Sequence, residues 1–341
     1  KKIGAGPVAG RVQDIELRNI SERERESEKV KKEEYWTITA DLKKAGDKNI
    51  FEAALTHQGE KKIEEAVTLK LFAGDYKTKK SIVSNKKNAD EITAELEKAK
   101  YSVKEITKKE ITRTPPPPFT TSTLQQAAIN SLGYSAKLTM MLAQKLYEQG
   151  FITYMRTDSM NLSMESMISA RKMIEKKFGP SYALESPRFF KTKSKGAQEA
   201  HEAIRPTNPN QSPDDLEKLD EKQRKLYGLI WRRMVASQMQ PSVLNSVKVL
   251  IDAKNAKNNY TLQANGSTIK FEGYLKVYGD KLPVTETLLP DLKEKEGLNP
   301  EKIIPVQKFT TPPPRYNEAS LVRVMEEYGI GRPSTYAPTI S

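Results

Sequence analysis

The spacing of hydrophobic and polar residues predicts two β-rich stretches on either side of a helical stretch. Residues 35–42 alternate between hydrophobic and polar positions, as in a half-buried strand, and residues 101–107 and 247–251 also have strand character. Further strand-like patterns lie at residues 51–56, 63–71, 260–262, 269–271 and 274–278. From about residue 119 to residue 239 the pattern is helical instead. The chain is therefore predicted to be an α+β protein with a helical insert.

Several local signals divide the helical stretch into separate helices. Ser122, with Gln125 three residues later, has the spacing of a capping box and predicts a helix start. Gly133 divides this region into two helices, and the second is predicted to end at Gly150. The longest predicted helix covers residues 216–239, and we expect it to have a structural role rather than a catalytic one.

A highly charged helix is predicted before the first strand, from Asp14 to Lys32. Its only aliphatic residues are Ile15, Leu17, Ile20 and Val30, which would form a narrow apolar stripe. Later in the chain, two proline runs, Pro115–Pro118 and Pro312–Pro314, predict boundaries. Such runs are stiff and extended, and they cannot enter the interior of a sheet because proline has no backbone N–H.

The composition favours a nucleic-acid partner and excludes several kinds of site. The 341 residues include 57 Lys and Arg against 44 Asp and Glu, a net charge of +13, which is typical of proteins that bind nucleic acid. Ordinary solvated lysines on the surface are the alternative explanation. The chain has no cysteine and two histidines, His57 and His201, so we expect no disulfide and no zinc site.

The ends and the hydropathy of the chain suggest where it works. No run approaches the ~20 apolar residues of a membrane span, and no signal peptide is visible, so we expect a cytoplasmic protein without membrane contact. The first residues, Lys1-Lys2-Ile3-Gly4, lack an initiating methionine. We therefore expect the chain to be a fragment of a longer protein.

The most informative chemistry lies in the segment from Gly150 to Ser159, which has the sequence GFITYMRTDS. In an extended backbone Tyr154 and Arg156 point to the same side. A tyrosine hydroxyl can attack a phosphodiester, and a guanidinium can stabilise the charge that develops on phosphorus. From the spacing alone, a short strand with a half-buried tyrosine and a surface arginine is the favoured interpretation, because a catalytic motif needs confirming context.

Five segments, in order along the chain, resemble motifs of the type IA DNA topoisomerases. They are residues 10–13 (GRVQ), 119–128 (FTTSTLQQAA), 150–159, 198–207 (QEAHEAIRPT) and 328–337 (YGIGRPSTYA). The methionine after Tyr154 and the EAIR sequence after His201 are more similar to bacterial topoisomerase I than to topoisomerase III. The resemblance extends over nearly the whole chain.

The resemblance implies a role for ten residues. Tyr154 would be the nucleophile, Arg156 would stabilise the transition state, and His201 would contact phosphate or transfer a proton. The implied DNA-binding residues are Arg11, Gln13, Arg18, Asp158, Arg205, Arg332 and Thr335. Simpler roles remain open for three positions: Asp158 would brace a turn, Arg205 would pair with a glutamate, and Arg332 would lie in an ordinary loop entering a helix.

The resemblance also implies a toroidal fold with a β-rich arch and a helical active-site domain. Residues 1–34 and 312–341 would belong to the base domain. Residues 35–114 and 242–311 would form the two halves of the arch, and residues 115–241 would form the tyrosine domain.

Two departures from the family pattern put DNA contacts at the start of the chain in doubt. Asp14 stands where the family has a small hydroxyl residue, and residues 4–8 do not follow the family pattern.

The implied activity is transient cleavage of one DNA strand through a 5′-phosphotyrosine, followed by strand passage that relaxes negative supercoils without ATP. Its partners would be single-stranded DNA and negatively supercoiled duplex DNA, and the protein would work as a monomer at the nucleoid. Mg²⁺ would be bound by an acidic N-terminal domain, called Toprim, that this sequence does not contain, so the fragment alone would be inactive. The alternatives are a topoisomerase III-type decatenase, a single-stranded DNA-binding module without catalysis, and a helical scaffold with incidental charge.

Overall fold

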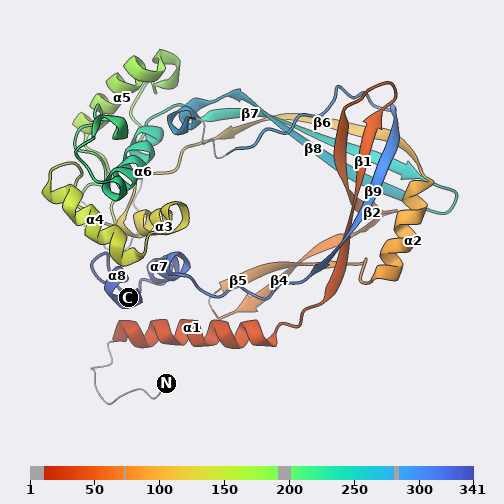
Figure 1. The fold of residues 1–341 in the computed structure, drawn as a ribbon, viewed down its shortest axis with the longest axis horizontal. Helices are drawn as coiled ribbons and strands as arrows, with labels where there is room; N and C mark the ends of the chain where they lie inside the picture. The colour runs from red at the N-terminus through yellow and green to blue at the C-terminus, as the bar shows by residue number, and fades with distance from the viewer. Residues whose placement is uncertain (1–10, 73, 191–200, 280–283) are drawn as a thin grey trace.

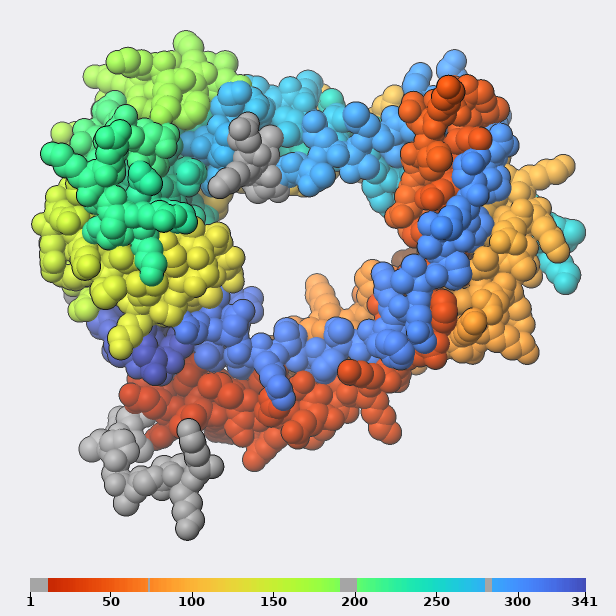
Figure 2. Space-filling view, in the orientation of Figure 1, coloured from red at the N-terminus to blue at the C-terminus, as the bar shows by residue number. Residues whose placement is uncertain are grey.

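The computed structural model describes residues 11–72, 74–190, 201–279 and 284–341. In it the chain forms a ring around an open centre, which Figure 1 shows as a ribbon and Figure 2 as a clear opening between atoms. A helical unit forms one side of the ring, and a strand barrel forms the opposite side. Long strands connect them along one edge, while α1, a β-hairpin and the C-terminal segment lie along the other (Figure 1).

The strand barrel is a closed antiparallel cycle in the order β1-β9-β6-β7-β8-β2, with β2 hydrogen-bonded back to β1. Its strands are β1 (Glu34–Lys44), β2 (Ile50–Gln58), β6 (Lys100–Arg113), β7 (Ser242–Lys254), β8 (Asn259–Phe271) and β9 (Gly297–Phe309). The short β3 (Lys61–Lys62) extends β2. Closure of the cycle leaves few unpaired strand edges. The strands predicted at residues 35–42, 51–56, 101–107 and 247–251 are confirmed, and residues 260–262 and 269–271 belong to one strand.

One hydrophobic core joins the barrel strands to α2 (Lys86–Glu97). Alternate residues of β1, namely Ile38, Ala40 and Leu42, are buried in it, as the period of two requires. Leu96 of α2 is completely buried in the same core. A separate hairpin of β4 (Glu64–Leu71) and β5 (Gly74–Ser81) follows β3 and lies along the lower edge of the ring in Figure 1.

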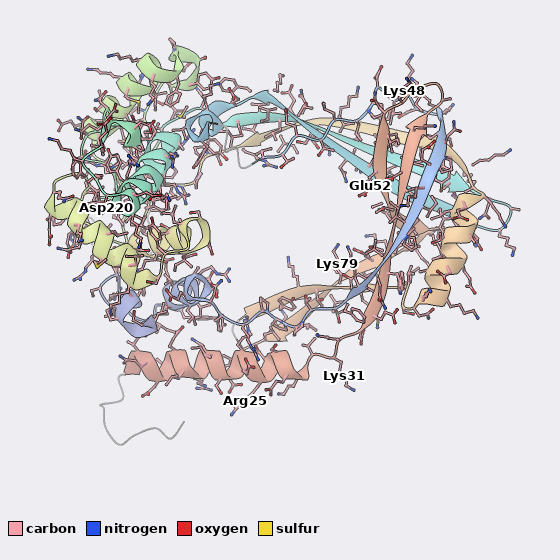
Figure 3. All side chains as sticks on the ribbon, viewed as in Figure 1. Arg25, Lys31, Lys48, Glu52, Lys79 and Asp220 are labelled. Atoms are coloured by element: carbon pink, nitrogen blue, oxygen red, sulfur yellow. The ribbon has the colours of Figure 1, made fainter. Side chains whose placement is uncertain are left out.

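The helical unit comprises α3 (Thr121–Leu132), α4 (Ala136–Glu148), α5 (Met164–Phe178) and α6 (Glu221–Ser237), with short 3₁₀ helices η1 (Pro180–Tyr182), η2 (Pro213–Asp215) and η3 (Gly273–Tyr278). These elements share a second core that includes Leu124, Leu146, Ile152 and Ile230. Side chains of Thr120, Ser135, Ser163 and Asp220 cap the four helices by accepting a hydrogen bond from a backbone N–H of the first turn. Figure 3 labels Asp220 on this side of the ring.

Three predictions about the helical unit are wrong in detail. The capping box of α3 is formed by Thr120 and Thr123, because the Ser122 hydroxyl donates to Glu326 instead. The predicted helix at residues 216–239 begins only at Glu221, where Asp220 supplies the cap. It has 17 residues and is shorter than α1, which has 19.

The predicted strand at residues 274–278 is the 3₁₀ helix η3. Gly273 has a φ of +54°, and a Cβ built on it would lie 2.2 Å from the carbonyl oxygen of Pro241. The chain turns sharply at this close approach, and the Tyr274 N–H then donates to the Gln240 carbonyl. Because only glycine fits this backbone, the strand cannot continue past it.

The remaining helices are α1 (Arg11–Lys29), α7 (Glu318–Glu327) and α8 (Tyr336–Ile340). The predicted helix at the start of the chain is confirmed, but its aliphatic stripe faces outward, with Ile15, Leu17 and Ile20 exposed. The inner face is polar. There, Arg23 lies over the ring of Tyr316 and donates to the carbonyl of Pro314.

Arg25, labelled in Figure 3, lies on the outer side of α1. Val12, near the start of this helix, packs against a small core formed by Val322, Met325 and Tyr336. None of the helices described is both long and apolar enough to cross a membrane.

Candidate active site

Three of the segments singled out in the sequence are hydrogen-bonded to one another at the surface of the helical unit. The backbone of Ile204 donates to Phe119, and the backbone of Thr207 donates to Phe151. We call residues 151–160 the connector, since they join α4 to α5. The segment that follows His201 is therefore hydrogen-bonded both to the connector and to the segment that precedes α3.

Threonine side chains reinforce this arrangement. Thr153 donates a hydroxyl hydrogen bond of 2.7 Å to the Ala203 carbonyl, and its backbone N–H donates to the Arg205 carbonyl at 2.9 Å. Thr121, the first residue of α3, makes equivalent contacts with Met155 and Thr157. Both threonines fix the backbone next to Tyr154, although neither lines the site. The sequence analysis did not identify them, and their only signal was a hydroxyl residue within a matched motif.

Burial alternates along the connector and turns Tyr154 and Arg156 outward. Met155 and Thr157 are 1% and 2% exposed, whereas Tyr154 is 43% exposed. This period of two is the one that extended backbone gives, and it puts both outward side chains on the same side, as the sequence predicted. The ring of Tyr154 packs edge-on against that of Tyr147 of α4, with centroids 5.3 Å apart.

A hollow of about 450 Å³ collects five of the ten singled-out residues. We call it the active-site hollow; its lining includes Tyr154, Arg156, Asp158, His201 and Arg332. They come from the connector, from the segment after residue 200 and from the loop between α7 and α8. Within the part of the chain that the structure describes, neither Arg156 nor Arg332 takes part in an ion pair. Both guanidiniums are therefore available to an anionic ligand.

Acidic groups lie at one side of the hollow, where α3 meets α7. Ser122 donates a 2.7 Å hydrogen bond to the carboxylate of Glu326. Much of Glu326 is exposed, but its carboxylate loses hydration against α3, and this, with the nearby charges of Glu327 and Asp158, raises its pKa. Burial and the negative charges of Glu326 and Asp158 raise the pKa of Tyr336 to about 12. This side of the hollow is thus unfavourable for a further negative charge.

Arg205 and Thr335 do not line the hollow. The Arg205 guanidinium forms a 2.7 Å ion pair with Glu202, whose other oxygen accepts the N–H of Ser163. Burial raises the pKa of Glu202, but the hydrogen bond and the charge of Arg205 outweigh it and leave that pKa lowered. Thr335 accepts a hydrogen bond from the N–H of Arg332 and so braces the turn that carries this arginine.

The residues singled out on α1 are separate from the hollow. Gln13 and Arg18 are exposed, and Arg18 lies 5.1 Å from the centre of the Phe72 ring at the end of the β4–β5 hairpin. The side chain of Arg11 lies outside the described residues, as do residues 198–200 of the histidine motif. The structure thus brings four of the five segments together, at residues 119–128, 150–159, 201–207 and 328–337, and places Gln13 of the first segment away from the hollow.

The described residues do not fit a metal ion. No group of three or more histidine, cysteine, aspartate or glutamate side chains among them could hold one. Among the described residues that line the hollow, Asp158 is the sole carboxylate, and two arginines line the hollow with it. Cationic side chains suit an anion rather than Mg²⁺, which prefers oxygen ligands.

The chain is similar to known proteins in sequence and in fold. The sequence model of the DNA topoisomerase family matches residues 2–341. The chain is 46% identical to DNA topoisomerase 1 of Rickettsia felis and 47% identical to that of Rickettsia conorii; it is covered completely in both cases and spans 43% of each relative. A crystal structure of full-length topoisomerase I from Thermotoga maritima superimposes with a TM-score of 0.75 at 34% identity, over 98% of this chain and 51% of that one. The chain belongs to the type IA DNA topoisomerase family.

Proposed function

We propose that this chain carries the nucleophile of a type IA DNA topoisomerase. The Tyr154 hydroxyl attacks a backbone phosphorus of single-stranded DNA, and a bond from the tyrosine oxygen to phosphorus replaces the bond to the 3′ oxygen. The strand with the 5′-phosphate stays attached to Tyr154, and the other strand leaves with a 3′-hydroxyl that has gained a proton. Attack by that hydroxyl reverses the step, so ATP is not required.

The observation that carries this proposal is the gathering of Tyr154, Arg156, His201 and Arg332 in one hollow. A phosphodiester needs charge stabilisation when it is attacked. Two guanidiniums that form no ion pair with a described residue lie beside an exposed tyrosine and supply it. His201, exposed on the opposite segment, is positioned to contact the phosphate or carry the proton. Asp158 would orient the bound strand from the acidic side of the hollow.

The shape and charge of the molecule support strand passage. The open centre of the ring in Figure 2 offers a place for a second DNA strand, and the net charge of +13 favours a polyanion. In this proposal the barrel and its long strands (residues 35–114 and 242–311) act as an arch. The helical unit (residues 115–241) acts as the tyrosine domain, and the two ends of the chain belong to the base. Relaxation of negative supercoils is the proposed outcome.

The family resemblance implies a magnesium ion, but the cleavage step proposed above is written without one. Because the described residues lack a suitable set of oxygen ligands, we derive no step through the metal. We expect an acidic domain from outside this sequence to supply it.

Covalent capture of DNA tests the proposal. A single-stranded oligonucleotide labelled at its 3′ end is incubated with the chain, Mg²⁺ and a family acidic domain, and the reaction is quenched with denaturant. Tyr154→Phe should abolish the labelled adduct, because the nucleophilic oxygen is lost. Tyr147→Phe is the matched control, since Tyr147 is 41% exposed and its ring contacts that of Tyr154. It should leave the adduct intact.

Two outcomes would reject the cleavage proposal. An adduct that still forms with Tyr154→Phe would show that another residue is the nucleophile. Salt-sensitive retention of the oligonucleotide without any adduct would favour the single-stranded DNA-binding module, whose affinity Tyr154→Phe should leave unchanged.

A further inference from the structure

Thr121 is hydrogen-bonded to the connector on both sides of Arg156. The Thr121 side chain is completely buried, and its hydroxyl oxygen lies 2.7 Å from the carbonyl oxygen of Met155 and 3.0 Å from that of Thr157. The Thr157 N–H donates to the same hydroxyl at 2.8 Å, and the Thr121 N–H donates to the Thr157 carbonyl at 2.9 Å. One residue of α3 therefore satisfies main-chain groups of two connector residues.

These contacts determine which way Arg156 faces. The side chains of Met155 and Thr157 are held in the core, so the residue between them must point to the active-site hollow. A rotation of the connector would have to break the bonds to Thr121 before it could turn Arg156 away. Tyr154 precedes Met155 directly, so its backbone is held by Thr121 on one side and by Thr153 on the other.

Thr121 is itself anchored on a rigid element. It is the first residue of α3, whose start is fixed by a capping box between Thr120 and Thr123. The next residue, Ser122, is 2% exposed and donates to Glu326 of α7. The turn that holds the connector is therefore attached to the helical core and to α7 at the same time.

We propose that Thr121 is a positioning residue for strand cleavage, whose hydroxyl holds Tyr154 and Arg156 in reactive geometry. This inference rests on the proposed function. Thr121 does not line the hollow and acts only through the connector backbone. Without its hydroxyl the buried N–H of Thr157 loses its acceptor, which is costly in a dry site, so the connector shifts. A displacement of about 1 Å at a reacting group lowers a rate by about 100-fold.

Three variants separate positioning from general stability. Thr121→Val removes the hydroxyl but keeps the shape, and Thr121→Ser keeps the hydroxyl. Thr139→Val is the matched control, because Thr139 of α4 is equally buried and its hydroxyl donates at 2.8 Å to the carbonyl of Ser135, the N-cap residue of its own helix. The measurements are the rate of adduct formation at saturating 3′-labelled oligonucleotide in the complemented assay, and the affinity for that oligonucleotide.

Thr121→Val should slow adduct formation by roughly 10- to 100-fold while affinity changes by less than about 3-fold, because geometry rather than binding is lost. Thr121→Ser should restore the rate to within about 3-fold of wild type, and Thr139→Val should match wild type. Equal rates in Thr121→Val and Thr139→Val would overturn the proposal. Failure of Thr121→Ser to restore the rate would overturn it too.

Hydrogen exchange of the Thr157 amide provides a test that does not depend on catalysis. In the wild-type chain this amide should be as protected as the central amides of α3, and Thr121→Val, if it folds, should lose that protection selectively. An unprotected Thr157 amide in the wild type would overturn the positioning role, even if adducts form. An absent wild-type adduct together with a protected amide would instead reject the proposed function and leave the backbone contacts standing.

Discussion

The helical unit is connected to the rest of the ring at two places that differ in kind. At the barrel side, β6 and β7 pair from Lys100 opposite Lys254 to Arg113 opposite Ser242, with one register shift between Val103 and Glu105, and they lead directly into the unit. At the α7–α8 side, no backbone–backbone hydrogen bond among the described residues crosses the contact. Two carboxylates of α7 make the polar contacts instead: Glu326 accepts from the Ser122 hydroxyl, and Glu318 accepts from the N–H of Ala136.

Side-chain packing also differs between the two places where the helical unit meets the rest of the ring. At the barrel side, the rings of Tyr182 and Phe271 lie 5.1 Å apart, and η3 packs on β7. At the α7–α8 side, a hollow of about 320 Å³ remains between α4 and α8, lined by residues that include Met140 and Ala337. A contact made by side chains can separate without breaking secondary structure, whereas a shared strand ladder cannot. The ring should therefore open at α7 and bend at the strands.

The largest effect is expected from Gly273→Ala, which disrupts the strand side. The added Cβ would lie 2.2 Å from the Pro241 carbonyl oxygen, a backbone atom that cannot move aside. We expect a loss of roughly 2–4 kcal/mol in unfolding free energy, measured by denaturant titration. Gly279→Ala is the control, because its φ is +57° with nothing within 4 Å of the new Cβ. Equal losses in the two variants would refute the close-approach explanation.

The next effect is expected from Glu318→Ala combined with Glu326→Ala, which weakens the α7 side. Each lost hydrogen bond to a carboxylate costs about 1 kcal/mol at a partly exposed site, so the open form of the ring should become more populated. Since the chain has no cysteine, labels at Met141→Cys on α4 and Arg323→Cys on α7 would report their distance by electron spin resonance.

The matched control for this pair is Glu175→Ala, which removes a carboxylate from an ion pair on the surface of α5. The label distances should broaden to longer values in the α7 variant and stay unchanged in the control. An unchanged distribution in both would show that the α7 contact does not depend on these carboxylates.

A smaller effect is expected from Gly331→Ala, in the loop that carries Arg332. Its φ is +78°, and the new Cβ would lie 2.7 Å from the Thr335 hydroxyl, which braces the turn. A side-chain oxygen can move, so we expect a loss of about 1–2 kcal/mol and weaker oligonucleotide retention. Gly329→Ala has a similar φ of +66° but no close neighbour, and it should retain more DNA. Similar retention by both would contradict the role of the turn.

The smallest effect concerns pH at Glu326. Because its pKa is raised in the folded protein, the folded state holds this proton more tightly than the unfolded state does. The resulting stabilisation is complete below the ordinary value of 4.5 and is lost as the pH rises through the raised pKa. Glu326→Gln keeps an oxygen acceptor for Ser122 without the charge. Its melting temperature should exceed that of wild type at neutral pH, and the difference should shrink on acidification; a constant difference would contradict this.

Local signals in the sequence predicted much of the helical unit, because capping residues and glycines act over a few positions. The outward direction of Tyr154 and Arg156 followed from the period of two. β9 was missed, since Pro300 and Pro305 interrupt its pattern and its partner β1 lies far away in the chain. The hydrogen bonds of Thr121 could not be predicted either, because they depend on how α3 and the connector meet in space.

The orientation of α1 also depends on contacts with a distant part of the chain, which local sequence patterns do not reveal. The sequence predicted a narrow apolar stripe, but the residues that face inward are polar and include Glu16 and Arg23. Tyr316 and the carbonyl of Pro314 are the partners of Arg23 there. The sequence near α1 contains no sign of those partners, which lie almost 300 positions away.

The most direct test of the central claim is to locate the DNA on the captured chain. Trypsin releases residues 146–156 as one peptide, which contains both Tyr147 and Tyr154. After nuclease trimming, fragmentation in a mass spectrometer distinguishes the two tyrosines. We expect a nucleotide linked through its 5′-phosphate to Tyr154. A nucleotide on Tyr147, or on any other peptide, would contradict it.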